Sequence, residues 1–199
     1  DAGVYGEDRI HLTPLPDLGG RTTYVATWQY VLNKASLHKD AARRFLAYAA
    51  SPEGSKSYAE KMNQEAVKMG ATHTNFVNPN GLTAAHHYTT ALDMAKMAAY
   101  GMKNFPEFRY IVGLKSYDVH YLDNRAPKRV TTTNHFLTSG YPGANGVKTG
   151  FTNAAGECLV ASATRDGHTL VLVLYNDDNR WTDAPTILDY GFRRLQTGK

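Results

Sequence analysis

A β-rich stretch from Pro142 to Thr169 constrains the fold of this 199-residue chain more than any other segment. Turn-forming residues at 143–146 lead into a predicted strand, and the run CLVASAT at 158–164 predicts a second one. Asp166-Gly167 then predicts a tight turn that pairs this run with TLVLVLY at 169–175. The stretch therefore predicts consecutive antiparallel strands joined by short connections.

The triplet Lys148-Thr149-Gly150 stands inside the first of these strands. Side chains alternate along a strand, so Lys148 and Gly150 share one face and Thr149 points to the other. Gly150 leaves the backbone open to a ligand lying along the strand edge. A cation and a hydroxyl beside such an edge suit an anionic, peptide-like ligand. The alternative is a surface lysine among glycines that only form turns.

Composition excludes several classes of protein. Hydrophobic residues make up 42% and charged residues 20%, and no apolar run approaches the ~20 residues needed to span a bilayer. The net charge of +4 is scattered, without the basic tract of a nucleic-acid binder. Cys158 is the single cysteine, so no disulfide forms within the chain, and it is predicted to be a small buried residue. His86 and His87 lack a third ligand at metal-binding spacing, and no cofactor motif is present.

Over about residues 58–195 the chain resembles the D-alanyl-D-alanine carboxypeptidases, which are low-molecular-mass penicillin-binding proteins of the serine peptidase type. The resemblance rests on four segments in the family's order: KMNQEAVKMGATHTNFVNPNGL (61–82), HHYTTALDMAKMA (86–98), GVKTGFTNAAGECLVASATRDG (146–167) and ILDYGFRRL (187–195). It implies an α+β fold of the penicillin-binding-protein and β-lactamase type, here incomplete.

Residues 1–57 depart from that family. The segments LTPLP and NKASLHKDAARRFLAYAASPEGSKSYAE resemble the C-terminal part of extracellular sugar-binding proteins of ABC importers. We therefore predict two parts, a solute-binding-protein-like segment at 1–57 and a carboxypeptidase-like portion at 58–199. A recombined or engineered chimera would explain this arrangement, and so would a divergent or rearranged carboxypeptidase.

A penicillin-binding acyl transferase needs a serine activated by a lysine one helical turn later, because residues at i and i+3 share a helix face. Upstream of Lys148 and near a helix start, only Ser36 and Lys39 have this spacing. The resemblance implies that Ser36 is the nucleophile and Lys39 its base. The alternative is that Ser36 caps a helix and Lys39 lies in its first turn. The family's Ser-x-Asn element is missing between Ser36 and Lys148.

The resemblance also implies substrate-binding roles for Lys148, Thr149, Gly150 and Arg180. Arg180 precedes a final helix predicted at Thr182–Leu195, at the offset where the family keeps a cation near the substrate's terminal carboxylate. A guanidinium binds a carboxylate through a bidentate fork. A solvated loop arginine is the alternative.

The predicted architecture is an antiparallel sheet flanked by helices. Its strands are expected near 117–122, 145–151, 157–164 and 169–175, with a further strand at 22–32 joining an edge. Helices are expected from Pro52 to about Met69, from Thr90 onward, and at the C-terminus. The terminal helix should cover one sheet face through Ile187, Leu188, Tyr190 and Phe192.

The leading functional hypothesis is an exported serine-type D-Ala-D-Ala carboxypeptidase, or a derivative of one, that acts on peptidoglycan stem peptides and reacts with β-lactams. It would work outside the cytoplasm, and since no signal peptide opens the sequence, this would be a mature or excised form. The alternatives are a catalytically inactive chimera or scaffold, and a solute-binding fragment. An unpaired sheet edge also favours a homodimer.

Overall fold

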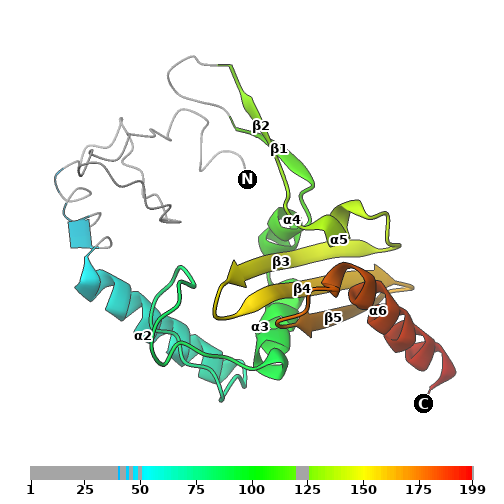
Figure 1. The fold of residues 1–199 in the computed structure, drawn as a ribbon, viewed down its shortest axis with the longest axis horizontal. Coiled ribbons are helices and arrows are strands. Elements are labelled where there is room, and N and C mark those ends of the chain that lie inside the picture. The colour runs from blue at the N-terminus through cyan, green and yellow to red at the C-terminus, as the bar shows by residue number, and fades with distance from the viewer. Residues whose placement is uncertain (1–39, 41–43, 45–46, 49–50, 120–125, 199) are drawn as a thin grey trace.

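The computed structural model describes residues 40, 44, 47–48, 51–119 and 126–198. Figure 1 shows a small twisted sheet with helices on both faces and a two-stranded ribbon that projects from the body. The elements follow in the order α2 (Pro52–Lys68), α3 (Ala91–Asn104), α4 (Pro106–Val112), β1 (Ser116–Val119), β2 (Lys128–Thr131), α5 (His135–Thr138), β3 (Ala144–Thr152), β4 (Gly156–Arg165), β5 (His168–Leu174) and α6 (Arg180–Thr197).

The main sheet has three antiparallel strands in the order β3-β4-β5. Asp166 and Gly167 form the turn between β4 and β5 with φ of 50° and 75°, the positive values that a tight hairpin turn needs. The three strands predicted at 145–151, 157–164 and 169–175 are therefore confirmed to within one residue at each end. In the register, Lys148 lies opposite Val160, and Gly150 lies opposite Cys158.

The prediction that a strand at 117–122 joins this sheet is wrong. β1 pairs with β2 in a separate two-stranded sheet, with Tyr117 opposite Val130. This ribbon projects from the body near α4 and α5 (Figure 1). An alternating sequence predicts a strand but does not specify which strand it pairs with. Here the pairing strand is the next extended segment along the chain. The strand predicted at 22–32 lies outside the described residues.

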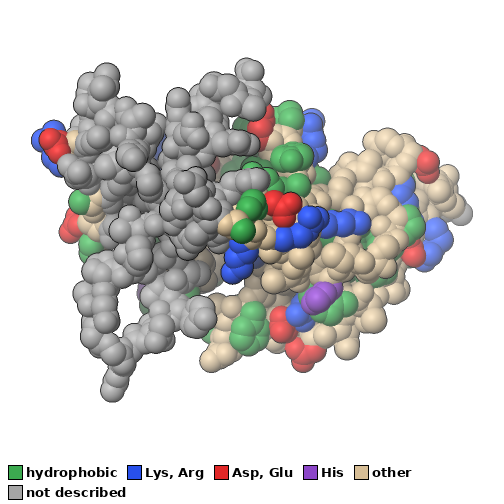
Figure 2. All heavy atoms as spheres, turned by 90° about the horizontal axis from the view of Figure 1, so that it is seen from above, with side chains coloured by type: hydrophobic (Ala, Val, Ile, Leu, Met, Phe, Trp, Pro, Cys, Tyr) green, Lys and Arg blue, Asp and Glu red, His purple; other side chains and the backbone are tan. Residues whose placement is uncertain are grey.

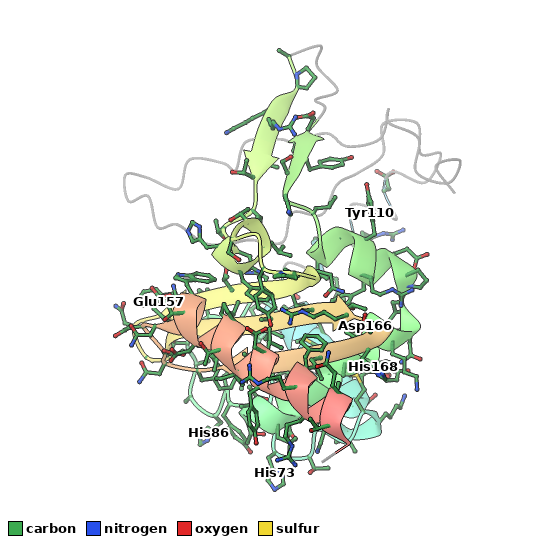
Figure 3. The ribbon with its side chains drawn as sticks, turned by 90° about the vertical axis from the view of Figure 1, so that its right-hand side faces the viewer. His73, His86, Tyr110, Glu157, Asp166 and His168 are labelled. Carbon is green, nitrogen blue, oxygen red and sulfur yellow. The ribbon has the colours of Figure 1, made fainter. Side chains whose placement is uncertain are left out.

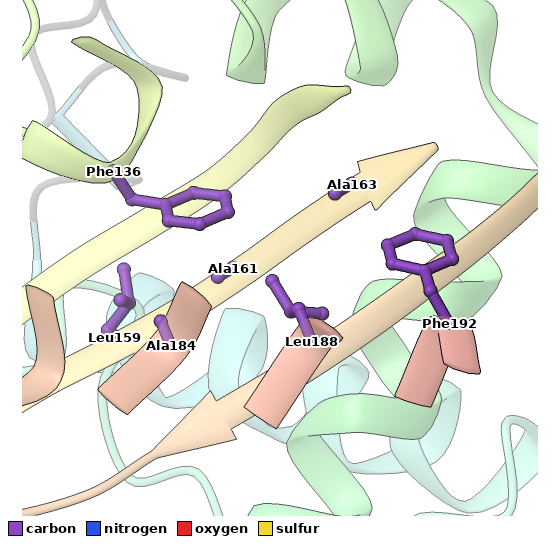
Figure 4. Packing of buried hydrophobic residues seen from close by; sticks show 7 residues of the cluster. All are labelled: Phe136, Leu159, Ala161, Ala163, Ala184, Leu188 and Phe192. Carbon is purple, nitrogen blue, oxygen red and sulfur yellow. The ribbon is translucent and has the colours of Figure 1, made fainter. Parts of the chain in front are cut away.

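The core lies between α6 and the main sheet (Figure 4). Its buried members come from α5, β4 and α6: Phe136, Leu159, Ala161, Ala163, Ala184, Leu188 and Phe192. The α6 members are spaced by four residues and form one helical stripe. Ile187 and Tyr190 are 42% and 55% exposed, so their predicted place against the sheet is wrong. They lie off the stripe that Ala184, Leu188 and Phe192 define.

Arg165 at the end of β4 joins the sheet to α6. Its guanidinium donates to Asp189 Oδ1 at 2.9 Å and lies 4.5 Å from the centre of the Tyr141 ring. The Tyr141 hydroxyl donates to the same carboxylate oxygen at 2.8 Å. Burial, reinforced by this hydrogen bond, raises the pKa of Tyr141 to about 12. The phenol therefore stays protonated and keeps donating to Asp189.

On the opposite face, α3 packs behind the sheet (Figure 1). Thr90 caps it by accepting from the backbone N–H of Asp93 at 3.1 Å, as predicted. The buried carboxylate of Asp93 contacts the preceding loop, where it accepts from His73 N at 2.6 Å and Thr74 Oγ1 at 3.0 Å. Burial acts to raise the pKa of Asp93, and these donors together with Lys96 lower it below its ordinary value.

The helix predicted from Pro52 to about Met69 is confirmed as α2 (Pro52–Lys68). Ser51 caps α2 by accepting from Gly54 N at 3.0 Å, and Pro52 occupies the first helical position. In the loop before α3, Asn78 Oδ1 accepts from Gly81 N at 2.8 Å and Asn80 Oδ1 accepts from Leu82 N at 3.0 Å. In the described residues, no helix is both long enough and apolar enough to cross a bilayer.

Candidate functional site

A pocket of about 360 Å³ opens beside β3, at the end of the sheet where α6 begins. We call it the anion pocket. Its walls come from the segment before α5, from β3, from the start of β4 and from the start of α6. The lining residues are Thr133, His135, Lys148, Thr149, Gly150, Phe151, Glu157, Arg180 and Trp181. The structure thus brings together four of the residues selected from sequence, namely Lys148, Thr149, Gly150 and Arg180.

β3 supplies the wall of the pocket that can bind a ligand's backbone. Within the described part of the chain, β3 pairs only with β4, so it is an edge strand. A Cβ built on Gly150 would meet only Cys158 Cβ, at 3.9 Å, so the space around Gly150 is open. An extended peptide can approach such an edge and form main-chain hydrogen bonds with it.

Lys148 and Thr149 are the polar side chains of this strand. Lys148 is exposed, and its Nζ donates to the carbonyl of Thr149 at 2.5 Å. Thr149 Oγ1 lies 3.4 Å from Thr133 Oγ1, which comes from the segment after β2. The wall therefore offers one ammonium group and two neighbouring hydroxyls.

Arg180 is the first residue of α6 and does not precede the helix as predicted. Its side chain is only 12% exposed, which also corrects the alternative of a solvated loop arginine. The guanidinium lies 4.5 Å from the centre of the Trp181 ring and 2.5 Å, nitrogen to oxygen, from Glu157 Oε2. Nη1 donates weakly to the carbonyl of Asp177 at 3.4 Å, and the buried Nε has no partner among the described residues.

His135 and Trp181 close another side of the pocket. Their rings meet edge to face, with centroids 5.2 Å apart. Asn134 positions this histidine, because it caps α5 by accepting from Phe136 N at 3.2 Å through its own side chain. Asn134 thus fixes the turn that leads into α5.

Sequence reasoning missed Thr133, Glu157 and Trp181. The register would have found Glu157, because it lies opposite Phe151 across the β3–β4 pair and so stands near the Lys148 triplet. Figure 3 shows Glu157 at the end of the sheet where α6 begins, with the Asp166 turn at the opposite end.

A second pocket of about 580 Å³ shares the segment 148–151 with the anion pocket and extends toward α3 through Met94. Cys158 and Tyr175 line it. Cys158 is partly buried, whereas the sequence predicted a small buried residue. Burial, with a smaller effect of Cys158, raises the pKa of Tyr175 to about 12.

The remaining candidate residues are the Ser36–Lys39 pair and the histidines His86 and His87. Ser36 and Lys39 lie outside the described residues. His87 Nδ1 accepts from Val77 N at 3.2 Å, and burial lowers its pKa. In the described ranges no three His, Cys, Asp or Glu side chains are grouped to hold a metal ion. On the face seen in Figure 2, the described Lys and Arg side chains are interspersed with carboxylates and apolar groups.

Comparison with known proteins relates this geometry to one family. The D-alanyl-D-alanine carboxypeptidase family, peptidase S11, matches residues 32–179. The chain is 33% identical over 145 residues to the D-alanyl-D-alanine carboxypeptidase DacF of Bacillus subtilis, covering 71% of this chain and 36% of the relative. It is 36% identical over 143 residues to a D-alanyl-D-alanine carboxypeptidase of a Streptomyces species, covering 69% of this chain and 49% of the relative.

A solved structure gives the same relation. The S216A mutant of the Streptomyces K15 DD-transpeptidase superposes with a TM-score of 0.65 at 35% identity, covering 71% of this chain and 56% of that one. The chain spans between about a third and a half of the length of these two curated relatives. Because the family match includes most of its residues, the chain belongs to the peptidase S11 family of D-alanyl-D-alanine carboxypeptidases.

Proposed function

We propose that this protein is a serine-type D-Ala-D-Ala carboxypeptidase, or a penicillin-binding derivative of one, that acts on peptidoglycan stem peptides through an acyl-enzyme. The observation that carries the proposal is the meeting of Lys148, Thr149 and Arg180 in one pocket beside an open strand edge. The family match supports it and begins at residue 32, so it includes Ser36 and Lys39.

In this mechanism the stem peptide lies along β3 and is held by main-chain hydrogen bonds near Gly150. The ammonium of Lys148 and the guanidinium of Arg180 bind the terminal carboxylate, with the Thr149 hydroxyl as a further donor. Lys39 takes the proton of Ser36, whose Oγ attacks the penultimate D-alanine carbonyl. The terminal D-alanine leaves with a proton, and water then hydrolyses the acyl-enzyme.

The second candidate is a non-catalytic scaffold or chimera that keeps this pocket. The absence of Ser-x-Asn between Ser36 and Lys148 favours it. Catalytic residues that act as a unit lose most of their rate when one is removed. Any acylation by this chain is therefore expected to be slow.

Fluorescent penicillin tests the two candidates, because a β-lactam acylates the activated serine. The enzymatic proposal expects slow, stable labelling that Ser36→Ala abolishes. Ser57→Ala is the matched control, since Ser57 is an exposed serine on α2, and it should label like the parent. No labelling of a folded parent protein would refute the enzymatic proposal and leave the scaffold.

The location and assembly of the protein belong to the same proposal. Action on peptidoglycan places it outside the cytoplasm. The edge of β3 could instead pair with a second copy, as the sequence hypothesis of a homodimer requires. Light scattering at high protein concentration measures this, and a strict monomer contradicts the homodimer.

A further inference from the structure

Glu157 is a carboxylate in the wall of a pocket that otherwise suits anions. It stands at the start of β4, and its side chain is 34% exposed. Its Oε2 lies 2.5 Å from Nη2 of Arg180, the more buried of the two cations in the pocket. A carboxylate at this position repels an anionic ligand, so it lowers the affinity of the pocket for anions unless it has another effect there.

One effect of Glu157 is to orient Arg180. The guanidinium is held by Glu157 on one edge and by the ring of Trp181 on a face, with the Asp177 carbonyl as a weaker contact. A guanidinium fixed in this way loses little conformational freedom when a ligand binds. A glutamine could keep the same hydrogen bond, so orientation alone does not require a charge at position 157.

The other effect is on the charge of the pocket. Among the described residues that line the pocket, Lys148 and Arg180 are the two cations, and Glu157 offsets one of them, which leaves a formal charge of +1 when histidine is counted as uncharged. One carboxylate from a ligand brings the pocket to neutrality. A dianion leaves an excess negative charge beside Glu157, where the repulsion grows in proportion to the ligand's charge.

We propose that Glu157 is a specificity-determining residue that restricts the anion pocket to groups with a single negative charge. This inference rests on the proposed function of the same site and refines its substrate class. The preferred peptides end in a residue with an uncharged side chain, so that the terminal carboxylate is the only anion that enters. Termini that carry a second negative charge are selected against.

Trp181 makes the proposal measurable without catalysis. The chain has two tryptophans, Trp28 and Trp181, so Trp28→Phe leaves the pocket residue as the only indole reporter. In this background, acetate stands for a chain-terminal carboxylate and sulfate for a dianion. Each is titrated by fluorescence at constant ionic strength and neutral pH into the parent and into Glu157→Gln.

Removing the charge of Glu157 should change the logarithm of the affinity about twice as much for the dianion as for the monoanion. We expect Glu157→Gln to tighten acetate binding roughly 3-fold and sulfate binding roughly 10-fold. Glu157→Asp keeps the charge and should keep the parent's selectivity. Glu65→Gln is the matched control, because it removes the same charge from α2, none of whose residues lines the pocket, and it should change neither affinity.

Equal tightening of both anions, weaker binding of both, or no response in any variant overturns the proposal. Weaker binding of both would mean that Glu157 only orients Arg180. Thermal unfolding of each variant confirms that the compared proteins are folded. Penicillin labelling is scored separately, so a selective pocket without labelling refutes the proposed enzyme but not the role of Glu157.

Discussion

At the scale of single residues, Gly143 shows how closely the turn before β3 approaches β4. A Cβ at Gly143 would lie 2.2 Å from the carbonyl oxygen of Thr164, and the residue has φ of 79°. Gly140 has nearly the same φ, 80°, but nothing lies within 4 Å of its added Cβ. The two glycines therefore share a backbone conformation, but only Gly140 has room for a Cβ atom.

We predict that Gly140→Ala costs about 1 kcal/mol of unfolding free energy, which is the penalty for a side chain in the left-handed region. Gly143→Ala should cost at least ~2 kcal/mol more, because the turn must also move away from β4. Urea denaturation of both variants measures the difference. Equal costs would show that the turn yields freely and that the close approach is unimportant.

The same scale explains which site residues could be predicted. Lys148, Thr149 and Gly150 are consecutive and stand in a strongly β-forming context, so local pattern and resemblance identify them. Glu157 is selected only by the β3–β4 register and by the position of the first turn of α6. β3 and β4 are neighbours in the chain, but α6 is distant from them, and one sequence does not specify that its first turn packs beside Glu157.

At the scale of elements, α6 illustrates what sequence periodicity determines and what it leaves open. The helix was predicted at Thr182–Leu195 and runs from Arg180 to Thr197, within two residues at each end. The predicted buried face of α6 was too wide. Apolar side chains at 187, 188, 190 and 192 extend further around the helix than the sheet covers. Burial depends on where α6 docks, which Arg165 and Asp189 help to set.

Substitution along α6 tests this assignment. Leu188 is 2% exposed and Ile187 is 42% exposed. Leu188→Ala should cost about 3 kcal/mol, because it leaves a cavity against β4, whereas Ile187→Ala should cost less than about 1 kcal/mol. Alanine favours the helix in both variants, so chemical denaturation isolates the packing difference. Similar costs would mean that α6 is rotated relative to this description.

At the scale of the whole molecule, the described part of the chain divides into a packed body and a ribbon. β3, β4, β5, α3 and α6 share buried contacts, whereas β1 and β2 have no fully buried residue. A two-stranded sheet is marginally stable by itself in water. The sequence predicted a strand only for the β1 segment and placed it in the main sheet, so neither β2 nor the separation of this ribbon from the body was predicted.

Replacing residues 117–130 by Asn-Gly tests whether the ribbon contributes to the stability of the body. Ser116 and Thr131 are directly opposed, so a two-residue turn can join them, and the bond from Thr132 N to Lys115 O at 2.9 Å can remain. We expect the free energy of unfolding to change by less than about 1 kcal/mol.

The matched control applies the same design to the body, with Asn-Gly in place of residues 164–169 between the opposed Ala163 and Leu170. This change removes Arg165, and with it the ion pair to Asp189 and the contact with the Phe192 ring, 4.6 Å from the guanidinium. Thermal and urea unfolding should show a loss of several kcal/mol, or no folding at all. A ribbon deletion as damaging as this control would mean that β1 and β2 support the body, and that the anion pocket depends on them through Thr133, which follows β2.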